Sequence, residues 1–551
     1  MSSPEIHLIL LSETAHPSRW PLGRVWHVPA SLRAIHELLH QLLPQHSPDA
    51  WLFWDARLGA PSADAVVNAY QLPGDVWHAG LKLGMGGRPG LMDFISPTGV
   101  FQKDPADSIV ATSWRLSLQA SLLKDKVLRQ LGGPFPQYRS LAGASLEMGY
   151  RYIRRGAFVR HVPFLVEEGK CQPDGAQALP FEDELRFALS HVRRLWVQWG
   201  LFRAVLSGYV APRQALHAWI RVRKEPLPST PPPYYQDVPP IKCKPDIAPV
   251  TVLIPTLERY PYLRTLLDQL RRQTIKPLEI IIVDQTPENA RDKGLETDFA
   301  DLPLRLFHLD RAGQCTARNY GLVRSAGKYI LFLDDDVEVP PTLIEDHLRT
   351  LEYFHADASS GIADEIGAGP LPVEYKILRP SDVFPTNNTM IRKDALYRSG
   401  LFDLAYDHGQ RADGDLGMRL YLGGALMVLN PDICVLHHHA PRGGLRAHKA
   451  RVITYASSRK YLLHRHLASV SDCYLMMRYF TPRQVREAVL KDLIGTFGFR
   501  GNIVRRLLKA IISLILLPHS AWVIGRRMRI AREMFKQYPQ IPSLDQPEAA
   551  A

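Results

Sequence analysis

The sequence has few cysteines, and none of them form a close pair. Its 551 residues contain Cys171, Cys243, Cys315, Cys434 and Cys473. Their odd number, wide spacing and lack of a C-x-x-C motif argue against a disulfide framework and a cysteine zinc site. The cysteine usage therefore predicts a reducing compartment, the cytoplasm.

The sequence also lacks an export signal and a long apolar run. The opening residues, MSSPEIHLILLSETAHPSRW, have no basic segment before their short apolar run, which predicts a first β-strand. The longest apolar run, Ala510 to Gly525, is shorter than the roughly 20 residues of a spanning helix and contains Pro518 and His519. We expect no membrane-spanning helix here.

Basic residues flank that apolar run on both sides. Such a pattern is typical of a segment lying in an anionic membrane interface, and a core helix with basic ends is an equal alternative. The flanking residues are Arg505, Arg506, Lys509, Arg526, Arg527, Arg529 and Arg532. The whole chain carries a net charge of +12, but no nucleic-acid-binding motif accompanies it, so we expect no nucleic-acid partner.

A proline-rich stretch divides the chain. Because proline lacks the amide donor that helices and inner strands need, EPLPSTPPPYYQDVPPIKCKPDIAPV (225–250) predicts a linker. The predicted organisation is an N-terminal domain (1–224), the linker (225–248), a second domain (249–445) and a helical, basic C-terminal region (446–551).

Short apolar runs alternate with helical patterns after the linker. We expect strands at 250–255, 278–284, 304–309 and 329–333, and helices at 262–273 and 315–325. This alternation predicts an α/β fold with a mainly parallel sheet covered by helices, whose ligands gather at the carboxyl ends of the strands.

An internal repeat relates the two halves. GYRYIRRGAFVRHVP (149–163) aligns with GMRLYLGGALMVLNP (417–431), and SLLKDKVLRQLG (121–132) aligns with TMIRKDALYRSG (389–400). Both pairs are separated by the same displacement along the chain. One displacement over both stretches predicts two related domains.

Three aspartates follow the predicted strand in YILFLDDDVEVPP (329–341). Carboxylate oxygens are the ligands that magnesium and manganese accept, especially when a substrate diphosphate supplies further oxygens. The sequence therefore predicts a metal and diphosphate site, and a solvated loop in which Asp334 caps the next helix is the alternative.

Three motifs together resemble the family 2 glycosyltransferases with the GT-A fold. They are VTVLIPTLERYPYLRTLLDQLRRQTIKPLEIIIVDQT, GQCTARNYGLVRSAGKYILFLDDDVEVP and ADGDLGMRLYLGG, and the match runs from about Pro249 to Leu445. The resemblance implies that a sugar is transferred from a nucleotide-sugar donor. It also assigns nucleoside binding to Pro255, Thr256, Glu258 and Asp284. The family often has an acidic residue after that last aspartate, whereas this chain has Gln285.

The same resemblance implies where the donor diphosphate and the metal lie. Arg318 would lie near the donor, and a helix-surface arginine is the alternative. Asp334 and Asp336 would form the D-x-D pair, with Asp336 the direct ligand of Mn²⁺ or Mg²⁺ and Asp335 a further donor contact. His437 would complete the metal site, with His438 or His439 as substitutes.

An inverting transfer needs a base beside the acceptor hydroxyl. The resemblance places that base at Asp413, where the usual E-D pair of the family reads Ala412-Asp413. Asp415 is the alternative, but it lies four residues before Arg419 and is well explained by an intrahelical ion pair.

The first half has lost these carboxylates. WLFWDARLGAP (51–61) aligns with the aspartate motif, so Asp55 matches Asp334 while Ala56 and Arg57 replace the next two aspartates. Ser145 stands at the position of the base. We therefore expect a degenerate, non-catalytic GT-A-like domain.

The expected function is inverting, metal-dependent glycosyl transfer to a hydroxyl acceptor, in cell-surface polysaccharide or glycolipid synthesis. Basic residues around 510–525 suggest a lipid-linked acceptor and a peripheral position on the cytoplasmic face of a membrane. The alternatives are a non-catalytic sugar-binding or scaffold protein, and a D-x-D phosphatase, although its threonine is missing.

Overall fold

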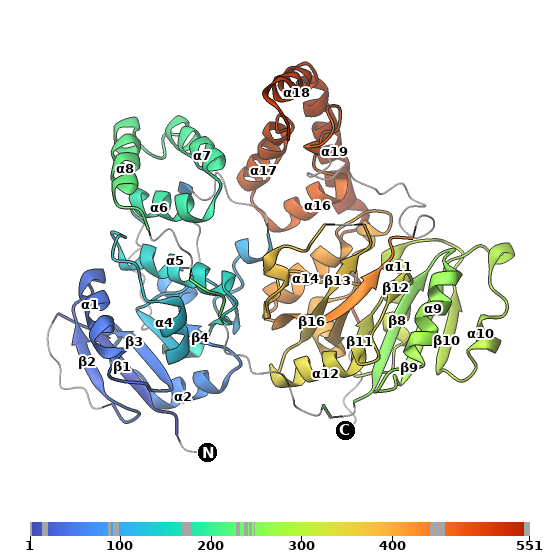
Figure 1. The fold of residues 1–551 in the computed structure, drawn as a ribbon, viewed down its shortest axis with the longest axis horizontal. Coiled ribbons are helices and arrows are strands. Elements are labelled where there is room, and N and C mark those ends of the chain that lie inside the picture. The colour runs from blue at the N-terminus through green and yellow to red at the C-terminus, as the bar shows by residue number, and fades with distance from the viewer. Residues whose placement is uncertain are drawn as a thin grey trace.

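Two α/β domains lie side by side, and each carries a group of helices on its upper side (Figure 1). The computed structural model describes residues 3–13, 20–85, 90–91, 99–167, 179–227, 232–235, 241, 245–246, 248–367, 369–440 and 458–544. Cys171 and Cys243, with most of the predicted linker, lie outside these residues.

The first domain is built on a seven-stranded sheet in the order β2-β1-β3-β6-β4-β7-β5. The predicted first strand is confirmed as β1. The elements are β1 (Ile6–Leu11), β2 (Val25–Val28), α1 (Leu32–Leu42), β3 (Ala50–Asp55), α2 (Ala63–Gln71), β4 (Val76–His78), β5 (Ala111–Thr112), β6 (Ala120–Lys124), α4 (Asp125–Leu131), α5 (Leu141–Arg154), β7 (Val159–His161), α6 (Phe181–His191), α7 (Arg194–Leu206) and α8 (Pro212–Lys224).

The second domain confirms the strands and helices expected after the linker, with ends within three residues of those predicted. Its elements are β8 (Val250–Thr256), α9 (Tyr260–Leu270), β9 (Glu279–Asp284), α10 (Leu295–Asp298), β10 (Leu304–His308), α11 (Gln314–Arg324), β11 (Tyr329–Phe332), β12 (Val337–Glu338), α12 (Leu343–Tyr353), β13 (Ala358–Glu365), β14 (Arg379–Pro380), β15 (Thr389–Arg392), α13 (Lys393–Ser399), α14 (Ala412–Leu422) and β16 (Met427–His437).

The sheet of this domain is mixed, and its parallel part is the part expected from the sequence. Strands β10, β9, β8 and β11 run parallel in that order, and β15 then pairs antiparallel with β11 and β13. Strand β13 runs parallel to β16. The sheet is thus less uniformly parallel than the alternation of strands and helices predicts, because β15 runs against both of its neighbours.

Burial on both faces explains the continuous apolar runs of these strands. Ile281 and Val283 pack in one core with α11, while Ile280 and Ile282 point to the opposite core with α9. Since successive side chains of a strand alternate between faces, a strand covered by helices on both sides needs an apolar residue at every position.

The two sheets share a strand order. The order β2-β1-β3-β6-β4-β7 of the first domain matches β9-β8-β11-β15-β13-β16 of the second, and each neighbouring pair has the same relative direction. Strands β5 and β14 begin at positions separated by the same number of residues as the sequence repeats. The same separation holds for the first residues of α4 and α13. No strand among the described residues of the first domain corresponds to β10.

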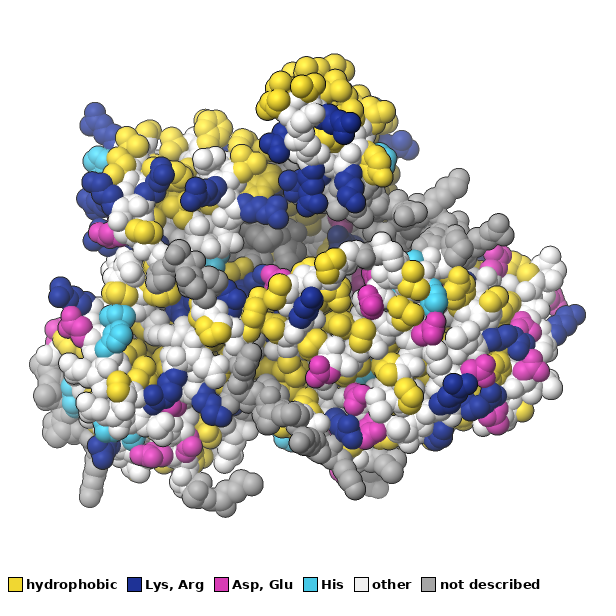
Figure 2. Space-filling view, viewed as in Figure 1, with side chains coloured by type: hydrophobic (Ala, Val, Ile, Leu, Met, Phe, Trp, Pro, Cys, Tyr) yellow, Lys and Arg dark blue, Asp and Glu magenta, His cyan; other side chains and the backbone are white. Residues whose placement is uncertain are grey.

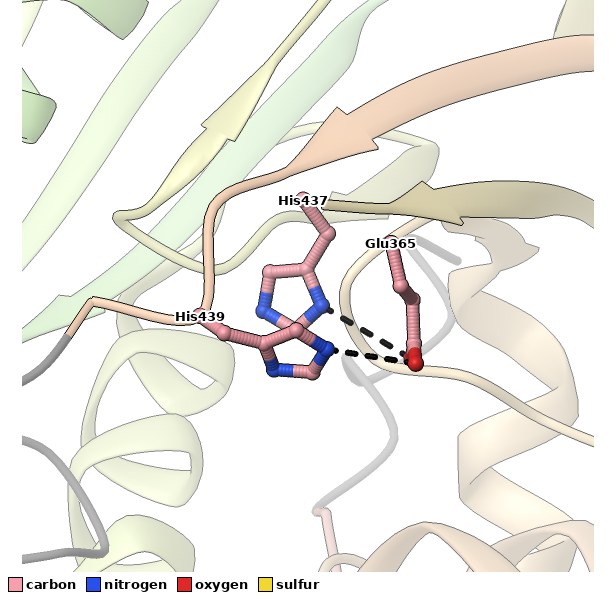
Figure 3. A group of neighbouring side chains, drawn as sticks. All are labelled: Glu365, His437 and His439. Carbon is pink, nitrogen blue, oxygen red and sulfur yellow. Dashed lines mark ion pairs between the residues drawn. The ribbon is translucent and has the colours of Figure 1, made fainter. Parts of the chain in front are cut away.

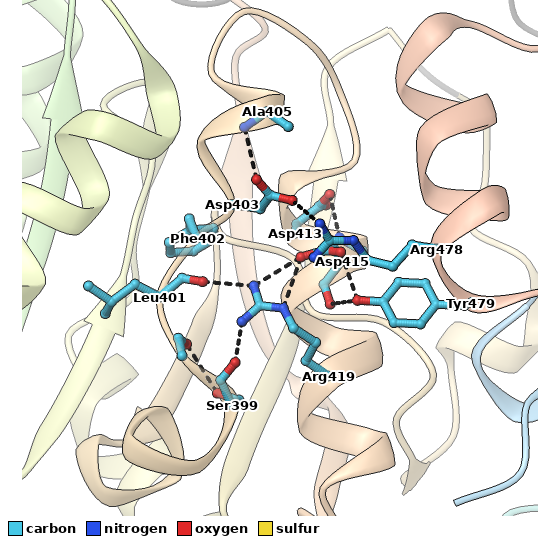
Figure 4. A network of polar contacts seen from close by, with 12 residues as sticks. Ser399, Leu401, Phe402, Asp403, Ala405, Asp413, Asp415, Arg419, Arg478 and Tyr479 are labelled. Carbon is cyan, nitrogen blue, oxygen red and sulfur yellow. Dashed lines mark hydrogen bonds and ion pairs between the residues drawn. The ribbon is translucent and has the colours of Figure 1, made fainter. Parts of the chain in front are cut away.

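An arginine whose side chain is 10% exposed or less holds the same position in both domains. In the second, Arg419 on α14 pairs with Asp415 at 2.9 Å and donates to the carbonyls of Ser399 and Leu401 at the end of α13 (Figure 4). At the equivalent position of the repeat in the first domain, Arg151 pairs with Glu147 and donates to the carbonyls of Leu131 and Gly133. Each arginine thereby fixes one helix against the end of another.

Each domain also carries a helical group. Helices α6, α7 and α8 of the first contain 11, 13 and 13 residues. The corresponding α16 (Val470–Tyr479), α17 (Pro482–Gly495) and α18 (Ile503–Ile515) contain 10, 14 and 13, and α19 (Leu517–Gln537) follows them. Within the described part of the chain, no single helix is long and apolar enough to cross a bilayer. Helices α18 and α19 together have sufficient length and apolar character, but the pair is bent by 57° at its junction.

Replacing Arg419 by Met should destabilise the protein strongly. The substitution leaves the fully buried Asp415 without its cation, and breaking a buried ion pair typically costs about 3–5 kcal/mol. Thermal or urea unfolding of the full chain would measure the loss. In the matched control, Arg33→Met breaks an exposed i,i+4 pair with Glu37 and should leave the midpoint unchanged. Equal midpoints for both variants would contradict the role assigned to Arg419.

Candidate active site

The predicted site residues meet at the carboxyl edge of the second sheet. Thr256 at the end of β8 lies opposite Asp284 at the end of β9. The aspartate triplet follows β11, the neighbour of β8 on its other side. His437 at the end of β16 and Asp413 in the first turn of α14 come from more distant parts of the chain.

Arginines supply the positive charge that the aspartate triplet requires. Arg259 lies 2.9 Å from Asp335 and 3.2 Å from Asp336. Arg318 lies 3.0 Å from Asp334, so it points into the site rather than to solvent. Sequence reasoning missed Arg259, and its position three residues after a strand at the ligand-binding edge was the available signal.

The carboxyls of Asp335 and Asp336 differ in proton affinity. Burial raises the pKa of Asp335 to about 7, despite the neighbouring Arg259. Burial would also raise the pKa of Asp336, but His437 and Arg259 outweigh it and lower this pKa to about 2. Burial opposes the charged form of His437, yet Asp336 raises the pKa of this imidazole above its ordinary value. The site thus holds Asp336 as an anion.

Asp334, Asp336 and His437 could hold a metal ion. Their ligand atoms all lie within 4.8 Å of one another. Among the described residues, the buried Oδ1 of Asp336 lies 3.3 Å from Nε2 of His437 without the geometry of a hydrogen bond, and Nδ1 of His437 has no hydrogen-bond partner. Carboxylate oxygens with an imidazole nitrogen form a donor set that suits Mn²⁺. The residues present therefore fit a divalent cation.

Glu365 forms a second, overlapping group with two histidines (Figure 3). Its carboxylate lies 4.0 Å from His437 and 3.2 Å from His439. The imidazole of His438 instead pairs with Glu338, while its backbone amide donates to the carbonyl of Asp336 at 3.0 Å. Glu365 was missed from the sequence, because nothing near it marks the end of β13 as part of the site.

Asp413 lies at the start of α14, half-buried, with one oxygen accepting from the amide of Gly414 at 2.8 Å. Burial raises its pKa above the ordinary value, while Arg411 and Arg318 act against that shift. A carboxylate with a raised pKa is a stronger base than an ordinary aspartate, and its second oxygen can accept a proton.

Asp415 is engaged in the structure of the domain (Figure 4). It is fully buried, and its carboxylate accepts from Arg419 at 2.9 Å and from the hydroxyl of Tyr479 at 2.7 Å. The bond from Tyr479 joins α14 to α16, and the two bonds together leave Asp415 poorly placed to exchange protons with a ligand.

Asp284, to which the family resemblance assigns the nucleoside, is held by two hydrogen bonds. The hydroxyl of Tyr260 donates to it at 2.7 Å, and the amide of Thr286 donates at 2.9 Å. Gln285 exchanges two hydrogen bonds of 3.0 Å with the backbone of Gly313, so this departure from the family pattern fixes the loop before α11.

The other three residues assigned to the nucleoside also lie at this edge of the sheet. Pro255 is half-buried in β8, where it pairs with Val283. Glu258 has a φ of 57° and an exposed side chain, and its amide donates to the hydroxyl of Thr286. The hydroxyl of Thr256 donates to Asp335 at 2.8 Å.

The matching edge of the first domain is closed by its own side chains. Asp55 accepts from Arg57 at 2.6 Å and from Gln119 at 3.1 Å. Ser145, at the position of Asp413, donates to the carbonyl of Leu141 at 2.6 Å. The residues that replace the carboxylates thus bond within the domain.

Comparison with known proteins gives a consistent picture. Residues 251–409 match the family model described as glycosyl transferase family 2. The relative YwdF of Bacillus subtilis, described as an uncharacterised glycosyltransferase, is 28% identical over 167 residues, covering 28% of this chain and 62% of its own length. YibD of Escherichia coli, described in the same way, is 37% identical over 100 residues, covering 17% of this chain and 28% of its own length.

Among solved structures, the mannosyltransferase PcManGT of Pyrobaculum calidifontis, in complex with GDP-Man and Mn²⁺, is 18% identical and covers 65% of this chain and 99% of its own. Its TM-score of 0.35 is too low to support an argument. The chain spans less than two thirds of the length of the curated relatives described above. The family match places residues 251–409 of the second domain in glycosyl transferase family 2.

Proposed function

We propose that the protein is an inverting, metal-dependent glycosyltransferase that moves a sugar from a nucleotide-sugar donor to a hydroxyl acceptor. The observation that carries this proposal is the meeting of Asp334, Asp336 and His437 with the separate carboxylate of Asp413 at one edge of the sheet. A donor needs a charged diphosphate clamp, and an acceptor needs a base.

The chain's own residues divide the work. Asp284 and Thr256 border the nucleoside side, and Arg318 faces the diphosphate side from α11. Asp413 removes the proton of the acceptor hydroxyl through its second carboxylate oxygen as that hydroxyl attacks the anomeric carbon. Mn²⁺ or Mg²⁺ held by Asp334, Asp336 and His437 would supply the charge that stabilises the leaving diphosphate.

Replacing Asp413 by Asn should lower kcat about 10²- to 10⁴-fold, the usual contribution of a general base, and leave donor binding largely intact. Asp55→Asn, at the matching end of β3 in the first domain, is the control and should keep full activity. Steady-state transfer and donor binding would measure both. Full activity of the Asp413 variant would remove the proposed base.

The pH profile should report the same group. Because burial raises the pKa of Asp413, this carboxylate is protonated, and unable to accept a proton, up to a higher pH than an ordinary aspartate. We expect kcat/KM to fall as the pH drops through that raised pKa. An acid limb at the ordinary pKa of aspartate would contradict the assignment.

Metal dependence can be tested with a panel of nucleotide sugars, using donor hydrolysis or thermal stabilisation in the presence of Mn²⁺. His437→Ala should raise the Mn²⁺ concentration for half-maximal activity by about tenfold or more. His438→Ala is the matched control, because His438 pairs with Glu338 instead. Equal activity with and without chelator would refute the metal site.

We propose that the first domain is a non-catalytic relative of the second. Its Asp55 and Ser145 bond within their own domain, and Ala56 and Arg57 replace the other two aspartates. Contacts with the second domain support a stabilising role. The rings of Phe158 and Phe354 stack at 4.9 Å, for example.

We also propose that the protein works in the cytoplasm, on the anionic face of a membrane, with a lipid-linked acceptor for polysaccharide or glycolipid synthesis. Large apolar side chains cover the exposed face of α18, where Figure 2 shows hydrophobic atoms at the top of the molecule. Leu507, Ile511 and Leu514 are 58%, 56% and 63% exposed. Arginines of α18 and α19 flank this face, which suits anionic lipid.

Replacing Leu507, Ile511 and Leu514 together by Asp should reduce binding to vesicles containing phosphatidylglycerol by about tenfold or more at low salt, because apolar insertion is lost and like charge is added. Co-sedimentation would measure it. The control replaces Leu278 and Val373, which are 49% and 52% exposed elsewhere, by Asp. Failure of the unmodified chain to bind such vesicles would refute membrane contact.

A further inference from the structure

A cavity of about 1030 Å³ is lined mainly by the first domain, together with Glu374 of the second, and by none of the residues of the aspartate site. Helices α5, α6, α7 and α8 line it together with Pro226, Leu227, Pro232 and Tyr234. We propose that this arginine cavity binds a diphosphate group attached to a ring-bearing or apolar group. This proposal does not depend on the transfer reaction.

Positive charge dominates the lining of the arginine cavity. Two carboxylates, Glu147 and Glu374, face a larger set of arginines, and each is already paired, with Arg151 at 3.1 Å and with Arg154 at 3.0 Å. The arginines that line the cavity are Arg151, Arg154, Arg155, Arg186, Arg194 and Arg223. The charge that remains would favour an anion.

Arg186 is the deepest of these arginines. Its side chain is 2% exposed, and Nε has no hydrogen-bond partner among the described residues. Among the described residues, the one carboxylate at ion-pair distance from Arg186 is that of Glu225. It is 3.5 Å away and 56% exposed. A buried cation is costly when its charge is incompletely neutralised and its donors are incompletely bonded, so an anion in the cavity would complete the site.

Aromatic rings, rather than carboxylates, hold two of the other arginines. Arg155 lies 4.8 Å from the ring of Tyr234, and Arg223 lies 5.7 Å from that of Trp219. Within the described residues, neither they nor Arg194 has a carboxylate at ion-pair distance. A guanidinium stacked on a ring keeps its N–H edge available, and that edge matches phosphate oxygens in pairs.

The size and the aromatic lining specify the ligand class. A volume of about 1030 Å³ is at the upper end of ordinary ligand sites and far exceeds one phosphate. Tyr150, Trp219 and Tyr234 add ring faces to the charged lining. A diphosphate with an attached nucleoside, or with a lipid chain, has the matching chemistry of charge beside an apolar group.

The second domain shows why this space is open in the first. There α19 packs on α16, with the ring of Phe535 at 4.4 Å from Tyr474 and 5.8 Å from Arg478. When α6 and α16 are aligned from their first residues, Arg478 of α16 falls at the position of Leu189 of α6. Leu189 lines the arginine cavity. No helix equivalent to α19 follows α8 among the described residues, so this face of α6 borders a cavity.

The test is calorimetric titration of the full chain with inorganic pyrophosphate in the absence of divalent metal, at constant ionic strength. We expect saturable binding that weakens about tenfold or more when Arg194 and Arg223 are both replaced by Ala. The control replaces Arg193 and Arg213, which are exposed and do not line the cavity, by Ala. It removes the same charge and should change the affinity less than twofold.

Several results would overturn the proposal. These are an absence of saturable binding, equal weakening by the cavity variant and its control, and equal affinity for pyrophosphate and inorganic phosphate. Asp413→Asn should leave pyrophosphate binding unchanged, so failure of the transferase proposal and failure of this one are distinguishable. UDP and geranyl diphosphate then identify the source. The ligand that binds more tightly than pyrophosphate, and loses that affinity when Arg194 and Arg223 are replaced, names the attached group, whereas UDP bound at the donor site of the second domain would be insensitive to these replacements.

Discussion

The candidate site of the second domain depends on one electrostatic constraint. A parallel sheet gathers several carboxylates at one edge, and positively charged side chains must neutralise them. Asp284 and the aspartate triplet converge there because the strands that carry them run in the same direction. Arg259, Arg318 and His437 supply opposing charge from three other elements. The strand ends, two helices and the end of β16 must therefore all keep their positions for the site to exist.

The first domain keeps the architecture of the second although it lacks the aspartate triplet. Its strand order, its buried arginine on α5 and its helical group all have counterparts in the second domain. The arginine stabilises a helix contact, a need independent of ligand. The carboxylates differ: Arg57 stands where the second domain has Asp336, and it pairs with Asp55, so a side chain of the domain itself neutralises the carboxylate that remains.

The sequence predicted what depends on local pattern. Strand and helix positions in the second domain followed from apolar periodicity, and the family resemblance led to residues whose ligand atoms the structure brings within 4.8 Å, although their roles stay predictions. Sequence could not indicate Glu365 or the pairing of Gln285 with Gly313. These contacts join segments far apart in the chain, and no pattern near either residue marks its partner.

The backbone conformation of Arg411 indicates how much of the chain is needed to hold Asp413 in place. This arginine has a φ of 80°, uncommon for a side chain of its size, and Asp472 on α16 holds its guanidinium at 2.6 Å. Asp413 follows two residues later, beyond residue 409 where the family match stops. A fragment cut after β16 would retain Asp413 but lose the anchor that shapes the turn before it. We therefore expect the smallest fragment that preserves this turn to include α16, since the C-terminal helical group packs against the segment that carries Asp413.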